Sequence, residues 1–334
     1  MITVSEDHRE TPVSGRPVSL PGGLHCIDLP QPLPGFRRFI SAWLFTDPLG
    51  RRVLVDPGPA DTIPLLIREL ESLTDGIDLI LLTHIHLDHS GGVGRLCVRF
   101  PGARVLAHPR AFRHLTDPEK LWRASVETLG DVARTYGPPA PVDGAVLIEK
   151  DEAGLVEVFP TPGHAPHHLA FRVSCGDARL LFVGEAAGLT LPTESGELWL
   201  RPTTPPRFDA AAALESLDRV ASVLVGDELL CYAHWGAYDD ARKRVALARS
   251  QVSEWLDIVA GMRNRPPEAI AGYLLEHDPL LRASLPEDLL ERERLFISET
   301  ACWVFWAFWP GRRRLMKAGE KRHRSECAAG RRLL

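Results

Sequence analysis

The sequence predicts an α/β (α+β) fold with a helical C-terminal appendage, on three observations. Short, continuously apolar runs bounded by Pro or Gly, such as residues 79–83, have the length and composition of strands buried on both faces. Residues 60–73 instead carry apolar side chains at helical spacing. After Tyr238 strand-like alternation disappears, and only helical patterning continues. Strands and helices therefore alternate first, and helices alone follow.

The expected elements follow one another along two similar halves of the chain. In the first half, strands are expected at 24–28, 39–46, 52–55, 79–83 and 104–107, with helices at 60–73 and, interrupted, at 109–142. In the second, strands are expected at 145–149, 155–160, 169–173, 179–183 and 229–233, with a helix at 210–225. We divide the chain into a loose lead-in, an α/β domain, a helical appendage and a basic tail, at residues 1–23, 24–240, 241–311 and 312–334.

Composition narrows the class of protein. The chain has 334 residues, 45% hydrophobic and 25% charged, which suits a globular protein with a sizeable core. No apolar run approaches the length of a membrane span, and the N-terminal segment has no apolar region typical of a secretory signal. Six cysteines lie far apart without a C-x-x-C pair, so we interpret them as reduced thiols of a cytoplasmic protein.

Charge is distributed unevenly. The net charge is −5, yet residues 312–334 hold nine basic and two acidic side chains, which leaves an acidic body. This is not the charge distribution of a dedicated nucleic-acid-binding protein. We interpret the tail as a solvated terminus, with weak contact to nucleic acid or anionic lipid as the alternative. The aromatic run at 302–309 is too short to span a membrane, and we expect it to pack on the body or across a homodimer interface.

The strongest chemical signal is Thr-His-Ile-His-Leu-Asp-His at residues 83–89, directly after a strand expected to be buried. Imidazole nitrogens and carboxylate oxygens are ligands of zinc and other first-row metals. An extended His-x-His places His84 and His86 on one side of the chain, and Asp88 and His89 follow where the chain turns. The motif therefore predicts a metal site.

Three further candidate ligands follow later strands. They are His164 in Thr-Pro-Gly-His, Glu185 after Gly184, and His234 in Ala-His-Trp-Gly. Each alone is a weak signal, since an isolated histidine is more often a surface or core residue. Sites of α/β sheets form outside strand ends, so these residues are able to converge with the first motif.

This order of motifs resembles the metallo-β-lactamase fold, over roughly residues 24–240. The segment Thr-Pro-Gly-His-Ala-Pro-His-His and the intact pair Asp88-His89 look closest to glyoxalase II-like hydrolases, and residues 108–122 resemble largely uncharacterised members. The resemblance implies an αββα sandwich with a binuclear metal site at one edge. It also implies a metal-dependent hydrolase acting on a small molecule.

The resemblance further implies particular ligands for two divalent ions, foremost zinc, with manganese or iron as alternatives. These are His84, His86 and His164 for one ion, Asp88, His89 and His234 for the other, and Glu185 as the bridge. Asp56 corresponds to an acid that supports the site. Most members carry Asp at the bridging position, and the longer arm of Glu185 leaves open a mononuclear site.

The implied reaction is attack of a metal-bound hydroxide on a small ester, thioester or lactone, with Asp88 as the catalytic residue that orients the nucleophile. Alternatives are a persulfide dioxygenase-like enzyme with one iron, a phosphodiesterase, and a non-catalytic binding protein. His167, His108 and Tyr136 are candidates for contact with the substrate or for support of the ligands. The alternative is that these three residues are only polar loop residues or packing residues with no role in the site.

Overall fold

The first half of the chain forms the larger of two sheets. The structure, a computed structural model, describes residues 18–307, with only the backbone given for the last turns at 299–307. The strands of this sheet lie in chain order and are β1 (Val18–Leu20), β2 (Leu24–Asp28), β3 (Ser41–Thr46), β4 (Arg52–Val55), β5 (Leu79–Leu81), β6 (Arg104–Leu106) and β7 (Leu147–Ile148). Pairing is antiparallel from β1 to β4 and parallel from β4 to β7.

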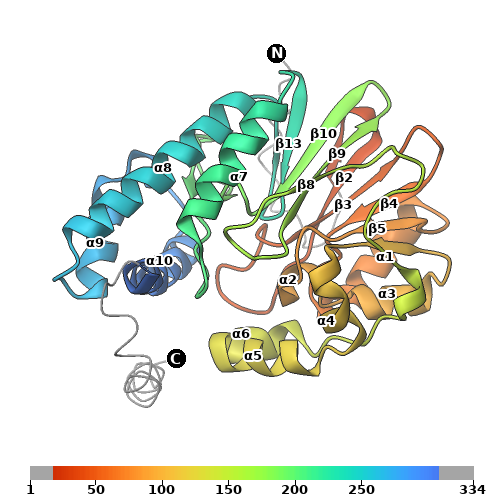
Figure 1. The fold of residues 1–334 in the computed structure, drawn as a ribbon, viewed down its shortest axis with the longest axis horizontal. Helices are drawn as coiled ribbons and strands as arrows, with labels where there is room; N and C mark the ends of the chain where they lie inside the picture. The colour runs from red at the N-terminus through yellow and green to blue at the C-terminus, as the bar shows by residue number, and fades with distance from the viewer. Residues whose placement is uncertain (1–17, 308–334) are drawn as a thin grey trace.

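The second half forms a smaller sheet that packs face to face with the first (Figure 1). Its order is β14 (Ala237–Tyr238), β13 (Glu228–Tyr232), β10 (Ala178–Gly184), β9 (Leu169–Cys175) and β8 (Glu157–Pro160), with only β10 and β13 parallel. Aromatic side chains fill the space between the sheets, and the rings of Phe45 and Phe182 stack 5.5 Å apart.

Helices cover the outer face of each sheet. Leu79 and Leu81 of β5 face the second sheet, whereas Ile80 faces the layer of helices, which explains why this strand is apolar throughout. The covering helices are α1 (Ile63–Leu73) and α3 (Val93–Arg99) on the larger sheet, and α7 (Ala210–Val223) and α8 (Ala241–Gly261) on the smaller (Figure 1). The predicted αββα sandwich is confirmed.

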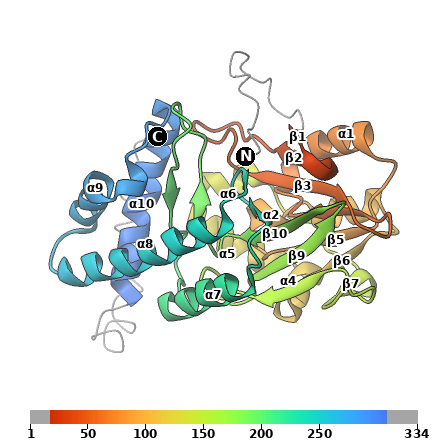
Figure 2. The same cartoon turned by 90° about the horizontal axis from the view of Figure 1, so that it is seen from above.

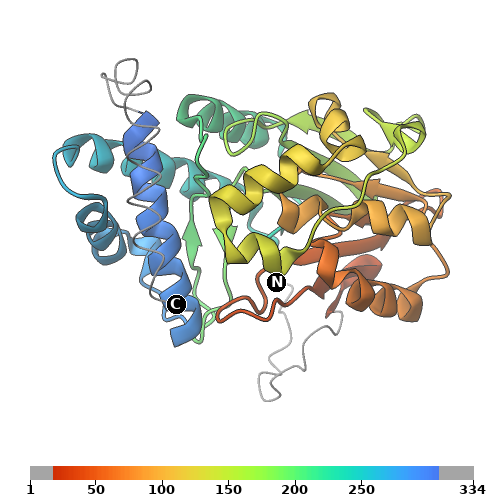
Figure 3. The same cartoon turned by 90° about the horizontal axis from the view of Figure 1, so that it is seen from below.

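The interrupted helical stretch expected at 109–142 is present up to Tyr136, as η3 (Pro109–Ala111), α4 (Phe112–Thr116), α5 (Glu119–Leu129) and α6 (Asp131–Tyr136), and residues 137–142 are not helical. After α8 the chain continues through α9 (Pro267–His277) and η5 (Pro279–Leu281) to α10 (Glu287–Ala307). From below (Figure 3), α5, α6 and α10 lie on the side of the molecule that also carries the short helix α2 (Leu87–Ser90).

Helix α10 packs on α9 and α8 and runs beside a small hairpin of β11 (Leu189–Thr190) and β12 (Leu200–Arg201), as Figure 2 shows. The expected helical appendage is thus present within the described residues, although its exact boundary as a domain stays a prediction. Within those residues, no helix has both the length and the apolarity that crossing a membrane requires. The basic tail, the side chains of the aromatic run and most of the lead-in lie outside the described part of the chain.

Several elements differ from expectation. The segment after β5 is not wholly a loop, since α2 forms within it. Strand β1 lies inside the expected lead-in and pairs with β2, and β11, β12 and β14 were not expected. Three of these four strands have only two residues, too few to show any alternation of apolar and polar side chains.

Candidate metal centre

The candidate ligands lie at strand ends of both sheets and converge. His84 and His86 follow β5, Asp88 and His89 belong to α2, and the other three follow β8, β10 and β13 of the smaller sheet. Their potential ligand atoms form two sets, each with its atoms within 4.8 Å of one another: His84, His86, His164 and Glu185; and Asp88, His89 and His234. All seven residues predicted as ligands are thus brought together.

In the first set, three imidazole nitrogens approach one point. His86 Nδ1 lies 3.0 Å from His84 Nε2 and 2.9 Å from His164 Nε2. Donors around tetrahedral zinc, at bond lengths of 2.0–2.1 Å, lie roughly 3.3 Å apart, so this spacing is close to what one ion requires. A cation is the natural partner for three lone pairs that face one another.

In the second set, Asp88 Oδ2 lies 3.3 Å from His89 Nε2 and 3.8 Å from His234 Nε2. Glu185 stands between the sets. Its Oε2 lies 2.9 Å from His164 Nε2 and 3.2 Å from His84 Nε2, and its Oε1 lies 3.3 Å from His234 Nε2. One carboxylate therefore contacts ligands of both sets.

Hydrogen bonds on the far side of the rings decide which nitrogen faces the centre. A carbonyl oxygen only accepts, so His164 Nδ1 donates to the carbonyl of Thr203 at 3.2 Å, and His234 Nδ1 donates to that of Phe39 at 3.1 Å. In both rings Nε2 then keeps its lone pair for a metal. These partners are main-chain atoms, which no sequence motif predicts.

Asp56 supports the centre from the end of β4. Its carboxylate accepts from the amide and hydroxyl of Thr83 at 2.8 and 2.6 Å and lies 3.4 Å from His89 Nδ1. Because the Thr83 hydroxyl donates to Asp56, it is free to accept from His84 Nδ1 at 3.1 Å. Asp56 has a positive φ of 48°, a conformation costly for this residue and common where geometry serves a site.

His168 is a supporting residue that sequence reasoning did not separate from His167. Its Nε2 accepts from the amide of Glu185 at 3.0 Å, and its Nδ1 lies 2.8 Å from the Thr161 hydroxyl. A Cβ at Gly184 would lie 2.5 Å from His168 Nε2. Gly184 is therefore the feature of the sequence that could have indicated this role of His168, because only glycine lets the turn approach His168 so closely.

Protonation follows from burial and from the carboxylates. Burial and neighbouring imidazoles lower the pKa of His86 to about 3 and that of His84 well below its usual value, so both rings are neutral. Burial raises the pKa of Glu185, but His164 and His234 outweigh it and hold the pKa well below its ordinary value. Burial likewise opposes a charge on His89, yet Asp88, Asp56 and Glu185 raise its pKa well above normal.

The site therefore suits divalent ions. Neutral imidazoles and ionised carboxylates leave an excess of negative charge in a buried place, and His89 gains a proton as the available cation. Both ring nitrogens of His89 are buried and lie 3.4 Å from Asp56 and 3.3 Å from Asp88, but within the described residues neither contact has the geometry of a regular hydrogen bond. Unsatisfied buried polar atoms are costly, and ligation would satisfy Nε2.

The three further candidates lie near the centre. The ring of His167 lies parallel to that of His84, 6.4 Å away, and its pKa is lowered to about 4 by burial and by His164, His108 and His114. Tyr136 is buried on α6, and burial and the charge of Asp88 raise its pKa. His108 lies close enough to influence His167, but its Nδ1 accepts from the Arg110 amide and so caps η3.

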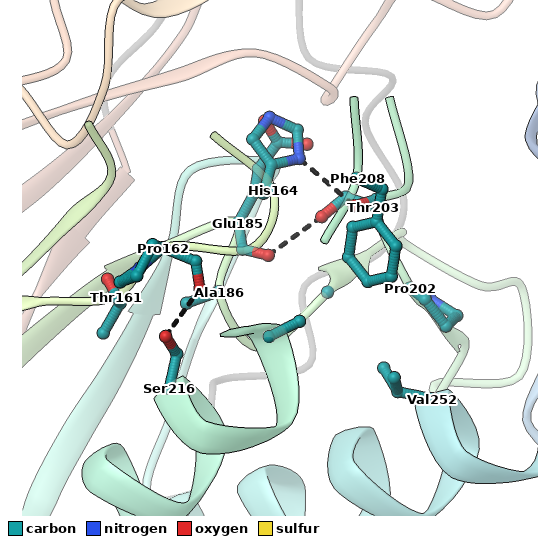
Figure 4. A pocket seen from close by; sticks show the side chains of 12 residues that line it. Thr161, Pro162, His164, Glu185, Ala186, Pro202, Thr203, Phe208, Ser216 and Val252 are labelled. Atoms are coloured by element: carbon teal, nitrogen blue, oxygen red, sulfur yellow. Dashed lines mark hydrogen bonds and ion pairs between the residues drawn. The ribbon is translucent and has the colours of Figure 1, made fainter. Parts of the chain in front are cut away.

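A pocket lies beneath the turns that carry His164 and Glu185 (Figure 4). Ser216 of α7 donates to the carbonyl of Pro162 at 2.6 Å, and the Thr203 hydroxyl donates to that of Glu185 at 2.9 Å. The pocket thus borders the main chain of both turns, and these hydrogen bonds join the turns to α7 and to the segment that contains Thr203.

Fold and site together define a class of protein, and comparison with known families gives the same result. Residues 35–234, more than half of the chain, match the metallo-beta-lactamase superfamily, and the chain belongs to that superfamily. The predicted resemblance is confirmed, and the relatives include metal-dependent hydrolases, as expected.

Particular relatives show how far the likeness extends. A metallo-beta-lactamase fold-containing protein of Sulfurisphaera tokodaii is 30% identical over 195 residues, which is 55% of this chain and 68% of that protein. Hydroxyacylglutathione hydrolase of Stenotrophomonas maltophilia is 34% identical over 145 residues, 43% of this chain and only 44% of that enzyme.

A solved structure gives the same fold. The archaeal metallo-beta-lactamase superfamily protein from Sulfolobus tokodaii has a TM-score of 0.59 at 24% identity, covering 84% of this chain and 97% of that chain. At this identity the likeness concerns the fold alone.

Proposed function

We propose that the protein is a hydrolase of small esters, thioesters or lactones that uses two divalent ions, with zinc preferred over manganese or iron. The position of Glu185 carries this proposal, because its two oxygens lie within 3.3 Å of ligand nitrogens from both sets. A mononuclear iron site of the two-histidine, one-carboxylate type has no need of the second set. The contacts of Glu185 with both sets, despite its extra methylene, support a bridging role.

Two bound ions would supply a water whose pKa falls to about 7 and would polarise the substrate oxygen. Asp88 has the best position to orient that water, since its side chain is 18% exposed whereas that of His89 is fully buried. Burial raises the pKa of Asp88, but His89 and His234 together have the larger effect and lower that pKa to about 2. The carboxylate therefore stays ionised at neutral pH and would accept a hydrogen bond from the attacking water.

The surroundings favour a small substrate. His167 and Tyr136 offer hydrogen-bonding groups near the candidate ligands, and α6 contacts α2, the helix that carries Asp88 and His89. The acidic body disfavours nucleic acid. Four cysteines within the described residues are unpaired, which agrees with the cytoplasmic location that we propose.

Elemental analysis of protein purified without added metal or chelator tests the proposal. We expect about two zinc or manganese ions per chain, followed by turnover of thioesters or lactones in a substrate screen. About one iron per chain, with oxygen uptake on persulfides, would overturn it in favour of a dioxygenase. Turnover confined to phosphodiesters would overturn the substrate class alone.

A further inference from the structure

Arg292 of α10 is a buried cation close to the second ligand set. It is 5% exposed, and its Nε and Nη2 donate to Glu293 Oε1 at 2.9 and 2.7 Å. The other oxygen of Glu293 accepts from Arg201 of β12. Arg201 and Arg292 thus share one buried carboxylate, and the Arg201–Glu293 contact joins α10 to the β11–β12 hairpin.

Arg292 also binds the segment between β2 and β3. Its Nη1 donates to the carbonyl of Gly35, and its Cζ lies 3.9 Å from the centre of the Phe39 ring. Gly35 permits this approach, since a Cβ there would lie 2.5 Å from the carbonyl oxygen of Asp288. All three guanidinium nitrogens already donate to protein acceptors, so Arg292 is placed to hold structure rather than to bind a substrate anion.

Phe39 connects Arg292 to a candidate ligand. Its ring stacks on the imidazole of His234 at 4.2 Å and 24°. A face so occupied has no room for a second planar group, so the guanidinium lies on the opposite face. The carbonyl of Phe39 also accepts from His234 Nδ1 at 3.1 Å. Phe39 therefore fixes both the plane of His234 and the nitrogen that faces Asp88 and Glu185.

We propose that Arg292 is a positioning residue for His234, acting through Phe39. The C-terminal helix thereby sets the geometry of the second ion site, although it contributes no ligand. The inference rests on the proposed function in one respect, since it takes His234 as a metal ligand. Lysine cannot replace this arginine, because a flexible ammonium offers neither the planar stack nor the fork of donors.

The chain offers a matched control. Arg37 also joins this segment to α10, through Asp288 at 3.0 and 3.1 Å, but it is half-exposed and does not stack on Phe39. Loss of Arg37 removes a loop–helix contact and leaves the Arg292–Phe39–His234 stack intact. Arg37→Gln thus separates general docking of α10 from the specific effect of Arg292.

The test is a zinc titration of the metal-free full-length chain with a competing chelator, on wild type, Arg292→Met, Arg292→Lys, Phe39→Leu and Arg37→Gln. We expect both Arg292 variants and Phe39→Leu to weaken the second ion by about 10- to 100-fold, as loss of a supporting partner does. In these variants the affinity for the first ion should stay at the wild-type value. Arg37→Gln should bind both ions with wild-type affinity. Equal weakening of both ions, or none, in the Arg292 variants would overturn the inference.

NMR of the histidine ring nitrogens in metal-free protein gives a second readout. Wild-type His234 should carry its proton on Nδ1, and Arg292→Met should show a mixture of tautomers. An unchanged tautomer would overturn the inference whatever the ion count. A wild type that binds one ion overturns the two-ion function instead, so the two failures are distinguishable.

Discussion

The candidate ligands on the larger sheet and those on the smaller sheet are held in place by different kinds of group. On the larger sheet, the single carboxylate of Asp56 holds His89 directly and His84 through Thr83. On the smaller sheet, His164 and His234 donate to main-chain carbonyls of Thr203 and Phe39. The first arrangement depends on a few side chains close in sequence, whereas the second depends on how distant segments fold.

This difference predicts where substitutions act. A side-chain partner is removed by one mutation, but a carbonyl partner survives substitution of its own residue. Variants around His84 and His89 should therefore lose metal affinity directly. Around His164 and His234, the same result requires changes in the residues that place the backbone.

The largest effect is expected for Asp88→Ala, which removes a candidate ligand of the second set and the residue that we propose orients the nucleophile. Turnover should fall by about 10³-fold or more, and the second ion should be lost. Steady-state kinetics and elemental analysis check this. Asp75→Ala, a change at an exposed position outside the ligand sets, is the control and should behave as wild type. Wild-type turnover in a metal-replete Asp88→Ala protein would contradict the two-ion mechanism.

Asp56→Asn comes next, since an amide cannot accept from both groups of Thr83 while facing His89. Zinc affinity should fall by about 10- to 100-fold, measured by chelator competition.

Thr203→Val is the matched variant for the smaller sheet. It removes only the hydroxyl bond to the Glu185 carbonyl, so stability should fall by about 1 kcal/mol while zinc affinity is kept. Equal losses of affinity in the two variants would remove the contrast.

His168→Ala should have an intermediate effect, because it leaves the buried amide of Glu185 without its acceptor. That costs about 1–3 kcal/mol of unfolding free energy and frees the Glu185 turn to move. We expect affinity for both ions to fall, since Glu185 contacts both sets. His168→Gln, which retains an acceptor, should recover part of the loss in thermal unfolding and zinc titration. Full wild-type affinity in His168→Ala would show that Glu185 needs no such support.

The same contrast explains what the sequence could reveal. The motif at 83–89 is contiguous, and Asp56 follows a recognisable strand, so residues on the larger sheet could be predicted together. Apolar runs predicted strands buried on both faces, and the resemblance to the metallo-β-lactamase fold implied the sandwich. The roles of Phe39, Thr203 and Arg292 could not be predicted. Phe39 and Thr203 act through their main-chain carbonyls, and Arg292 acts through the ring of Phe39. Such roles exist only once segments 39 to 257 residues apart are folded together, and hydrophobic patterning does not encode these contacts.

The smallest effect on activity is expected for Asp28→Asn, which tests the segment that carries Phe39. Asp28 is buried at the end of β2, and its Oδ1 accepts from the amide of Arg38 at 3.0 Å. Burial raises its pKa from 3.8 to about 6, opposed by the hydrogen bond from Arg38. The folded protein therefore favours the protonated acid, and this stabilisation is present below about pH 4 and is lost as pH rises through about 6.

The loss amounts to about 3 kcal/mol for a shift of this size, and an uncharged Asn should avoid it. Asp28→Asn should thus match wild type in unfolding free energy near pH 4 and exceed it at pH 7 to 8, with turnover and zinc affinity little changed. Denaturant unfolding across this pH range is the measurement. Parallel stability curves for the two proteins would show that Asp28 is already ionised in the fold without cost.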